Sequence, residues 1–364
     1  MPFDGSSGQI IVRADLGRGE ARRLILDTGA YESYLWSEEA AALGLTPSEP
    51  LRRRDASTSF TVRHVHGVRV AVGKAVVDGQ SFATKPRPMR HADGFLGYPW
   101  LSHFVVEVDF TAHRLRFWTP ACDRGGPDAT PVPLRFVEGR MPTLAATLTL
   151  AKGAPIDAEL MVDTGAGTTA ILNTPFVAEH ELLARAGRLA NAETGGVGGG
   201  RSALAVARAA SLRVGDFTLE RPIIELGKPD TAAGAGSFGA DHPWDGILGC
   251  GVLSRFDVVI DYPHARLLLR PTARFGEPFP HDVVQALLEE TPAGLRVVAL
   301  RHGGGADRAG LRPDDLIVAI AGAPAGTLTR KAFWAVADRE GVHVLDVRRG
   351  GERVQLKLVI ENVL

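Results

Sequence analysis

Two aspartates of this chain have nearly the same neighbours. Asp27 ends the segment RLILD, Asp163 ends the segment ELMVD, and both are followed by TGA. Two carboxyl groups that are brought together cannot both ionise readily, so one keeps its proton while the other is charged. The charged group can take a proton from water while the protonated group donates to a peptide carbonyl oxygen. The pattern predicts hydrolysis of peptide bonds without a metal or a covalent intermediate.

The residues that follow each aspartate suit this chemistry. Gly29 and Gly165 allow a tight turn in which backbone N–H groups approach the carboxylate oxygens. Thr28 and Thr164 carry hydroxyl groups that can form hydrogen bonds across the junction and fix both turns. The alternative is that both aspartates are ordinary turn residues that accept backbone N–H bonds.

A duplication of the chain favours the catalytic interpretation, because it explains why the motif occurs twice. Residues 93–117 align without gaps on residues 245–269, and 11 of these 25 positions are identical. The two aspartate motifs are 136 residues apart and the later blocks are 152 apart, so the second copy holds 16 extra residues between them. The repeated unit predicts two homologous lobes.

Each copy is predicted to consist mostly of β-strands. Residues 24–26 and 160–162 are short apolar runs that end at an aspartate, which is typical of buried strands that lead into a turn. The other predicted elements are strands at 10–12, 143–150, 105–110 and 258–262, hairpin turns at 72–74 and 214–216, and helices at 38–43 and 175–189.

With both motifs, the chain resembles the retropepsin-like aspartic peptidases, in particular the bacterial group that carries two lobes in one chain. The second signature of that family is two hydrophobic residues and a glycine late in each lobe. FLG at 95–97 and ILG at 247–249 match it, each after Asp-Gly. The resemblance covers about residues 1–270 and implies that Asp27 and Asp163 are the catalytic residues. The supporting residues that it implies are Thr28, Gly29, Ala30, Thr164, Gly165, Ala166, Leu96, Gly97, Leu248 and Gly249.

The resemblance also implies that each lobe has a flap hairpin that closes over the substrate. A glycine-rich stretch lies where the second flap is expected, and its glycines would supply hinge freedom. A disordered surface loop is the alternative. The predicted flap residues are Gly195, Gly196, Val197, Gly198, Gly199 and Gly200, with a counterpart around 57–65 in the first lobe. Ala30 and Ala166 replace the hydroxyl residue of pepsin-like enzymes, which predicts activity near neutral pH.

The last 80 or so residues have a different character. The segment AGLRPDDLIVAIAG at 309–322 resembles circularly permuted bacterial PDZ domains, and the order of strands and helices agrees. This resemblance implies capture of peptide ends by addition of a strand to the sheet. The loop that holds the terminal carboxylate would include Ala293, Gly294 and Leu295.

The predicted fold is therefore mostly β: two homologous retropepsin-like β-barrel lobes with pseudo-twofold symmetry, followed by an α+β PDZ domain. The predicted boundaries are 1–120 for the first lobe, 121–133 for a linker, 134–270 for the second lobe, 271–281 for another linker and 282–364 for the PDZ domain.

Composition and charge exclude several other classes of protein. With 41 basic and 42 acidic residues, the chain has no charge excess that would favour nucleic acid or an anionic membrane as partner. The eleven histidines show no paired-ligand spacing, so no metal and no cofactor are expected. Cys122 and Cys250 cannot form a disulfide framework, and whether they pair with each other stays open. No apolar run is long enough to span a bilayer.

The expected partners are a peptide or protein substrate and a PDZ ligand peptide, and a monomer suffices for the active site because both lobes are present. Residues 1–4 lack the features of a signal peptide. The protein is expected to be periplasmic or secreted if a leader was removed, and cytoplasmic otherwise. The predicted function is that of an aspartic-type endopeptidase. The alternative is a catalytically inactive scaffold that binds peptides in its cleft and PDZ groove.

Overall fold

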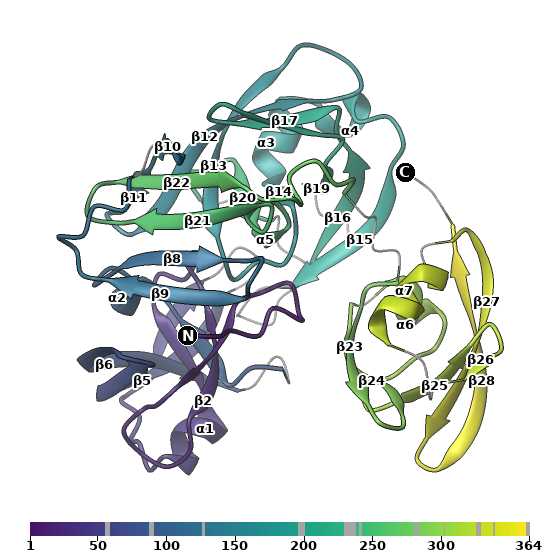
Figure 1. The fold of residues 1–364 in the computed structure, drawn as a ribbon, viewed down its shortest axis with the longest axis horizontal. Coiled ribbons are helices and arrows are strands. Elements are labelled where there is room, and N and C mark those ends of the chain that lie inside the picture. Colours follow the sequence, from purple (N-terminus) through teal and green to yellow (C-terminus); the bar gives the residue numbers. More distant parts are fainter. Residues whose placement is uncertain are drawn as a thin grey trace.

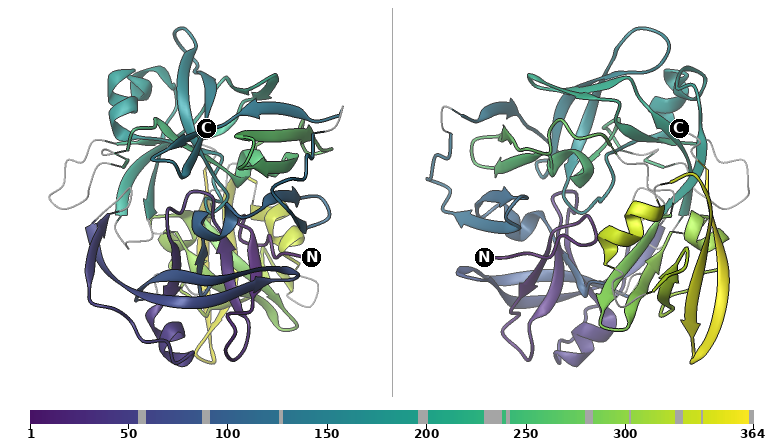
Figure 2. Two further views of the ribbon diagram at one scale, coloured as in Figure 1. Left: turned by 90° about the vertical axis from the view of Figure 1, so that its left-hand side faces the viewer. Right: turned by 45° about the vertical axis from the view of Figure 1, so that its right-hand side comes forward.

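The computed structural model describes residues 1–54, 59–86, 91–125, 128–195, 201–228, 238–239, 242–279, 284–301, 303–324, 329–337 and 339–361. The chain is mostly β-sheet. In all the views, the second lobe (teal and green) lies above the first (purple and blue) (Figures 1 and 2), and in Figure 1 the C-terminal module (green to yellow) lies to one side of both.

The first lobe is built on a sheet with the strand order β1-β2-β7-β3-β6-β5-β4. Strand β2 runs parallel to β7, so the strand before Asp27 lies beside the FLG motif. The elements of this lobe are β1 (Ile11–Ala14), β2 (Arg22–Leu26), β3 (Ser33–Trp36), α1 (Ser37–Ala42), β4 (Leu51–Arg54), β5 (Ser59–Val72), β6 (Ala75–Lys85), β7 (Gly94–Leu96) and α2 (Tyr98–Leu101).

The second lobe repeats this arrangement in the strand order β15-β16-β19-β14-β20-β13-β12-β17-β18, with β11 beside β12. Strand β13 runs parallel to β20, which carries the ILG motif. The elements are β11 (Arg135–Val137), β12 (Met141–Thr149), β13 (Ile156–Asp163), β14 (Ala170–Leu172), α3 (Thr174–Glu179), α4 (Leu182–Arg185), β15 (Ala190–Gly195), β16 (Arg201–Arg208), β17 (Ser211–Val214), β18 (Phe217–Glu220), β19 (Ile223–Gly227), β20 (Gly246–Gly249) and α5 (Cys250–Leu253).

A third sheet, in the order β10-β22-β21-β8-β9, joins the two lobes (Figure 1). Val106 of β8 lies opposite Ile260 of β21, and Val108 lies opposite Val258. Residues 106 and 108 correspond to 258 and 260 in the repeat, so the register of this ladder is twofold symmetric. The strands are β8 (Val105–Asp109), β9 (Arg114–Trp118), β10 (Thr130–Pro133), β21 (Phe256–Asp261) and β22 (Arg266–Pro271).

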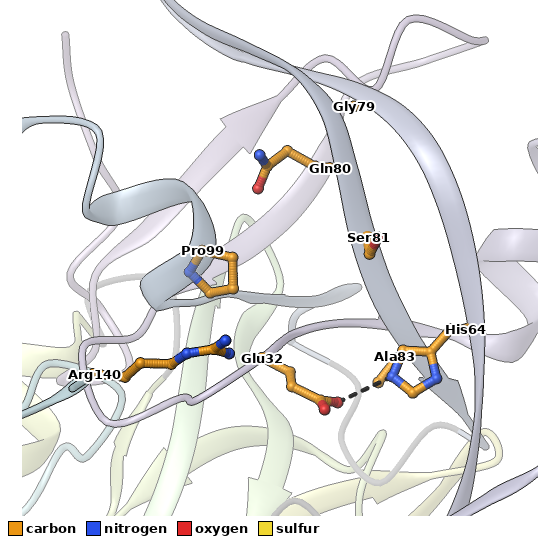
Figure 3. A pocket seen from close by; sticks show the side chains of 8 residues that line it. All are labelled: Glu32, His64, Gly79, Gln80, Ser81, Ala83, Pro99 and Arg140. Atoms are coloured by element: carbon orange, nitrogen blue, oxygen red, sulfur yellow. Dashed lines mark hydrogen bonds and ion pairs between the residues drawn. The ribbon is translucent and has the colours of Figure 1, made fainter. Parts of the chain in front are cut away.

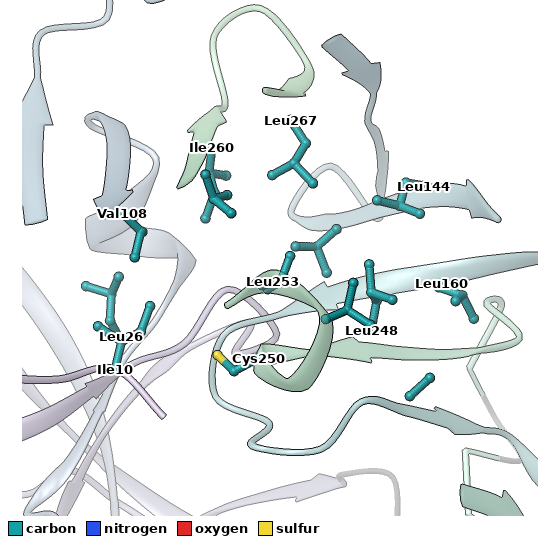
Figure 4. Packing of buried hydrophobic residues seen from close by; sticks show 14 of the residues in the cluster. Ile10, Leu26, Val108, Leu144, Leu160, Leu248, Cys250, Leu253, Ile260 and Leu267 are labelled. Carbon is teal, nitrogen blue, oxygen red and sulfur yellow. The ribbon is translucent and has the colours of Figure 1, made fainter. Parts of the chain in front are cut away.

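A common apolar core runs through both lobes. Figure 4 shows Leu26 and Val108 of the first lobe near Leu253 and Ile260 of the second, at the junction of the lobes. Burial of apolar surface is the main favourable term in folding and association. The two lobes are therefore expected to fold as one unit.

The C-terminal module has a sheet of its own in the order β23-β24-β25-β27-β28, with β26 beside β25. It also has its own apolar core, centred on Leu295, Ile317 and Phe333. The elements are β23 (Ala286–Thr291), β24 (Gly294–Leu300), α6 (Gly305–Arg308), β25 (Leu316–Ile320), β26 (Ala323–Pro324), α7 (Arg330–Ala337), β27 (Gly341–Arg349) and β28 (Glu352–Ile360).

Most of the local predictions are confirmed, including the strands before both aspartates and the two hairpin turns. The predicted helix at 175–189 is wrong in its length, because it is divided into α3 and α4 by Glu181, whose φ is 52°. The predicted linker at 121–133 is wrong in part, because β10 belongs to the sheet that joins the lobes.

The second linker is held against the second lobe. The Arg255 guanidinium donates hydrogen bonds to the carbonyl oxygens of Arg274 (2.8 Å), Glu277 (2.5 Å) and Pro278 (3.2 Å), and it stacks on the ring of Phe279. These contacts fix the chain up to the point where it leaves for the C-terminal module.

Candidate active site

The fold brings the two motif aspartates together at the junction of the lobes. Asp27 follows β2, and its backbone N–H donates to the Leu96 carbonyl oxygen (3.0 Å), while Asp163 ends β13. Each carboxyl group lies against the glycine of the opposite turn. A Cβ atom placed on Gly29 would be 2.6 Å from Cγ of Asp163, and one on Gly165 would overlap the Asp27 carboxyl group. The two side chains therefore face each other across the junction.

The threonines of the two turns form the predicted hydrogen bonds between the lobes. The Thr28 N–H donates to Oγ1 of Thr164 (3.1 Å), and the Thr164 N–H donates to Oγ1 of Thr28 (3.0 Å). Each hydroxyl then donates to the opposite strand, to the carbonyl oxygens of Val162 and Leu26 (2.6 Å each). Both threonines are buried. This closed set of bonds fixes the relative position of the two aspartates.

Replacement of one threonine tests that set. Thr164→Val keeps the shape of the side chain but leaves the Thr28 N–H and the Leu26 carbonyl without partners. Each of the two buried unpaired groups costs about 1–3 kcal/mol, so we expect the free energy of unfolding to fall by about 2–6 kcal/mol. Urea denaturation measures it, with Thr218→Val on the exposed face of β18 as the control. Equal stability of both variants would contradict the assignment.

The backbone treats the two aspartates differently. Oδ1 of Asp163 accepts hydrogen bonds from the N–H groups of Gly165 (2.8 Å) and Ala166 (3.1 Å). Oδ1 of Asp27 is buried, and among the described residues the N–H groups of Gly29 and Ala30 lie near this carboxyl group but form no hydrogen bond of normal geometry with Oδ1. Since N–H donors favour the charged form of a carboxyl group, Asp163 is the better anion of the pair.

The pKa values point the same way. Burial, the charge of Asp163 and a hydrogen bond to it raise the pKa of Asp27 well above its usual value, and the backbone N–H groups of Gly29 and Ala30 offset only part of that rise. Burial also raises the pKa of Asp163, but the hydrogen bond from Asp27 and the backbone N–H groups act against that rise. The pair therefore holds one proton, on Asp27, over the pH range between the two pKa values.

This order of pKa values predicts a bell-shaped pH profile. Activity needs ionised Asp163 and protonated Asp27, so kcat/KM should rise as pH passes the raised pKa of Asp163 and fall as pH passes that of Asp27. Both limbs are expected above the ordinary aspartate value of 3.8. The measurement needs a peptide without titrating side chains. A maximum below pH 4 would contradict the assignment.

The FLG and ILG motifs support the turns from behind. Leu96 and Leu248 are fully buried. A Cβ atom on Gly97 would be 2.6 Å from the Ala30 carbonyl oxygen, and one on Gly249 would be 2.7 Å from that of Ala166. A larger residue at either position would push the aspartate turn away, so the glycines allow this close approach.

Comparison with known proteins bears on the fold that carries this site. Residues 12–100, which include Asp27, match the model of the family described as aspartyl protease. The crystal structure of aspartic proteinase from Irpex lacteus matches 77% of this chain and 98% of its own, with a TM-score of 0.51 and 14% sequence identity. This chain has the fold of an aspartic proteinase. No curated protein matches it.

Two residues near the site in this aspartic proteinase fold, Gln9 and His91, were not predicted from the sequence. Nε2 of Gln9 donates to the Gly165 carbonyl oxygen (2.5 Å), so the first lobe contacts the turn that follows Asp163. Oε1 of Gln9 accepts a hydrogen bond from Nε2 of the half-buried His91 (2.9 Å). No motif marks either residue, because their role depends on contact between distant segments.

The cysteines take no part in the site chemistry. Both are free. The Cys250 thiol is buried and donates to the Thr164 carbonyl oxygen (3.3 Å), and burial raises its pKa. It is a packed side chain, and a thiol held in its protonated form is a poor nucleophile.

Hairpins occur where the flaps were predicted. Gly195 ends β15 and pairs with Arg201 at the start of β16, and Gly196, Val197, Gly198, Gly199 and Gly200 lie outside the described residues. In the first lobe β4 pairs with β5, with Leu51 opposite Val62, and residues 57–58 of the predicted counterpart lie outside the described residues. A closing motion of these hairpins stays a prediction.

The predicted carboxylate-binding loop of the C-terminal module does not agree with the strand pairing. Thr291 and Gly294 face each other across a two-residue turn, so Ala293 lies at the tip of a hairpin. Leu295 is fully buried in β24, which has β23 on one side and β25 on the other. A peptide cannot add to a strand whose two edges are already paired, so Ala293, Gly294 and Leu295 do not form the groove.

The remaining features to consider are metal-binding clusters and membrane-spanning helices. Within the described ranges, no cluster of three or more histidine, cysteine or acidic residues is placed to hold a metal ion. Among the helices of those ranges, none is long and apolar enough to cross a membrane.

Proposed function

We propose that the chain is an aspartic-type endopeptidase in which Asp27 and Asp163 form the catalytic dyad. The observation that carries the proposal is the pair of facing carboxyl groups that differ in their hydrogen bonds. Asp163 takes a proton from a water molecule, whose oxygen attacks the peptide carbonyl carbon, while Asp27 donates its proton to the carbonyl oxygen. Asp163 then passes its proton to the amide nitrogen, a hydroxyl group of the intermediate returns a proton to Asp27, the C–N bond breaks, and an acid and an amine leave.

The proposal includes a retropepsin-like arrangement of two lobes in one chain, related by a pseudo-twofold axis. The duplication, the paired motifs and the symmetric register of β8 and β21 support it. Because each lobe supplies one aspartate, a monomer suffices for the site.

The test is cleavage of a peptide library, with the products read by mass spectrometry. We expect a statine-type inhibitor, which imitates the tetrahedral intermediate, to block cleavage, and a metal chelator to leave the rate unchanged. Binding of the library without any cleavage, at every pH tested, would favour the inactive scaffold instead.

For the C-terminal module we propose a PDZ domain that binds peptide ends. In the described part of its sheet, β23 is an end strand, and helix α7 packs beside it. An extended peptide could add to that edge by main-chain hydrogen bonds. Its ligand would be a substrate or partner peptide.

The separate apolar core of this module predicts that residues from about Asp282 onward fold alone. The expected result for that fragment is a well-dispersed amide spectrum, because Leu295, Ile317 and Phe333 are buried within the module. A collapsed spectrum would show that the module needs the lobes for its stability.

A further inference from the structure

Each lobe has a row of side chains that runs across neighbouring strands of its sheet and begins at the strand before the aspartate. The two rows occupy corresponding positions in the two lobes. In the first lobe, strand register places Ile25, Phe95, Tyr34, Ala83 and His64 side by side. Residues opposite each other in neighbouring strands lie on the same face of a sheet. Ile25 precedes Asp27 by two positions, so the row lies on the face toward which the aspartate points.

In the second lobe the same register gives the row Met161, Ile247, Ile171, Glu225 and Val206. Met161 precedes Asp163 by two positions, as Ile25 precedes Asp27. With strands about 4.8 Å apart, the fourth member of each row lies about 14 Å along the sheet from the first. A peptide over the dyad would extend across both rows.

Glu225 therefore takes the place that Ala83 has in the first lobe, and Val206 takes that of His64. In the first lobe this end of the row opens into a cavity of about 300 Å³. Figure 3 shows Glu32 pointing toward His64 in this cavity, and their side chains are 3.2 Å apart.

The second lobe has a charged group at the same place, and the C-terminal module covers it. Nη1 and Nη2 of Arg301 donate to Oε1 (3.0 Å) and Oε2 (2.8 Å) of Glu225. Glu225 is 7% exposed, and its neighbours in the row, Ile171 and Val206, belong to an apolar cluster. Of the residues that the structure describes, Arg301 alone binds this carboxylate. A bidentate pair of this kind is strong and directional.

Arg301 is held in place by its own module. Its backbone N–H donates to the Gln285 carbonyl oxygen (2.9 Å), and its carbonyl oxygen accepts from the Gly304 N–H (3.0 Å). The side chain thus reaches the second lobe from the end of β24, beside the start of β23.

We propose that Arg301 is a specificity-determining residue: it covers and neutralises the acidic end of the second-lobe row, so that this end rejects cationic side chains of the substrate. The first-lobe end stays open at its cavity. The C-terminal module is then part of the substrate-binding surface. This inference rests on the peptidase function proposed above.

The test measures binding, so that it does not depend on turnover. In the Asp27→Asn chain, peptides that differ only in lysine or norleucine at one position are titrated by fluorescence anisotropy. Arg301→Gln should leave Glu225 uncovered and raise the preference for lysine at one or more positions about tenfold, the value of a good charge-assisted bond. Arg301→Gln with Glu225→Gln should abolish that gain. Arg296→Gln, which breaks an exposed pair with Glu289, is the matched control.

A second variant, Glu225→Gln, tests for a preference for the opposite charge in the peptide. Glu225→Gln leaves the Arg301 charge in place, so peptides with glutamate should gain affinity over those with glutamine. An unchanged preference in both variants would overturn the proposal, even if the wild-type chain cleaves peptides. If both variants change the peptide preference as predicted but the wild-type chain cleaves no peptide, the result would support the role of Arg301 over Glu225 and refute the peptidase function. If Arg301→Gln does not fold, the result for Glu225→Gln decides.

Discussion

Asp27→Asn and Asp163→Asn are each expected to lower kcat/KM by about 10³-fold or more, since proton transfer by a positioned group contributes up to about 10⁴-fold. An amide in place of Asp163 cannot take a proton from water. An amide in place of Asp27 cannot give the acidic proton to the carbonyl oxygen. Initial rates on a cleaved library peptide measure both effects.

The control separates loss of chemistry from loss of fold. Asp109→Asn changes another repeated aspartate, whose Oδ1 accepts a bond from the Ala112 N–H (2.7 Å) at a turn outside the site. It should keep near wild-type activity. Either dyad variant with a near wild-type rate would refute the catalytic assignment.

Although Asp27→Asn should lower kcat/KM, it should not lower the melting temperature at pH 7. The raised pKa of Asp27 means that the folded state prefers the protonated form, so this group stabilises the fold below its unfolded pKa and loses that effect as pH rises through the folded pKa. Asparagine stays neutral at every pH. The variant should therefore melt at or above the wild-type temperature at pH 7, with no gain near pH 3.

Gly165→Ala is expected to lower kcat/KM by about 10²-fold or more, because a Cβ atom there would occupy the position of the Asp27 carboxyl group. A misplacement of about 1 Å at a reacting group can cost about that much. Gly29→Ala should act alike, since its Cβ would be 2.6 Å from Cγ of Asp163. The effect arises from steric overlap, because neither glycine has a positive φ.

Gly276→Ala is the matched control, since among the described residues, apart from its chain neighbours, no atom lies within 4 Å of the added carbon. It should keep its rate and its melting temperature. Full activity of Gly165→Ala would mean that the two carboxyl groups do not face each other as described.

The sequence by itself determined the repeated framework of the site. The two DTGA segments, the apolar strands before them and the FLG and ILG motifs are visible because local patterns encode strands and turns, and the duplication repeats them. The threonine bonds between the lobes could be anticipated from the same residues. The catalytic role of the aspartates and the flap motions stay predictions.

Only the tertiary structure decided how the copies differ. The N–H groups that favour Asp163 as the anion depend on turn geometry, and the Gln9 bond to Gly165 joins segments 156 residues apart. The same holds for β10, which pairs with β22, and for Leu295, whose burial rules out the predicted peptide loop. Arg301 and Glu225 are 76 residues apart, in different modules. Such contacts have no local pattern, because they form only when the folded sheets bring distant residues together.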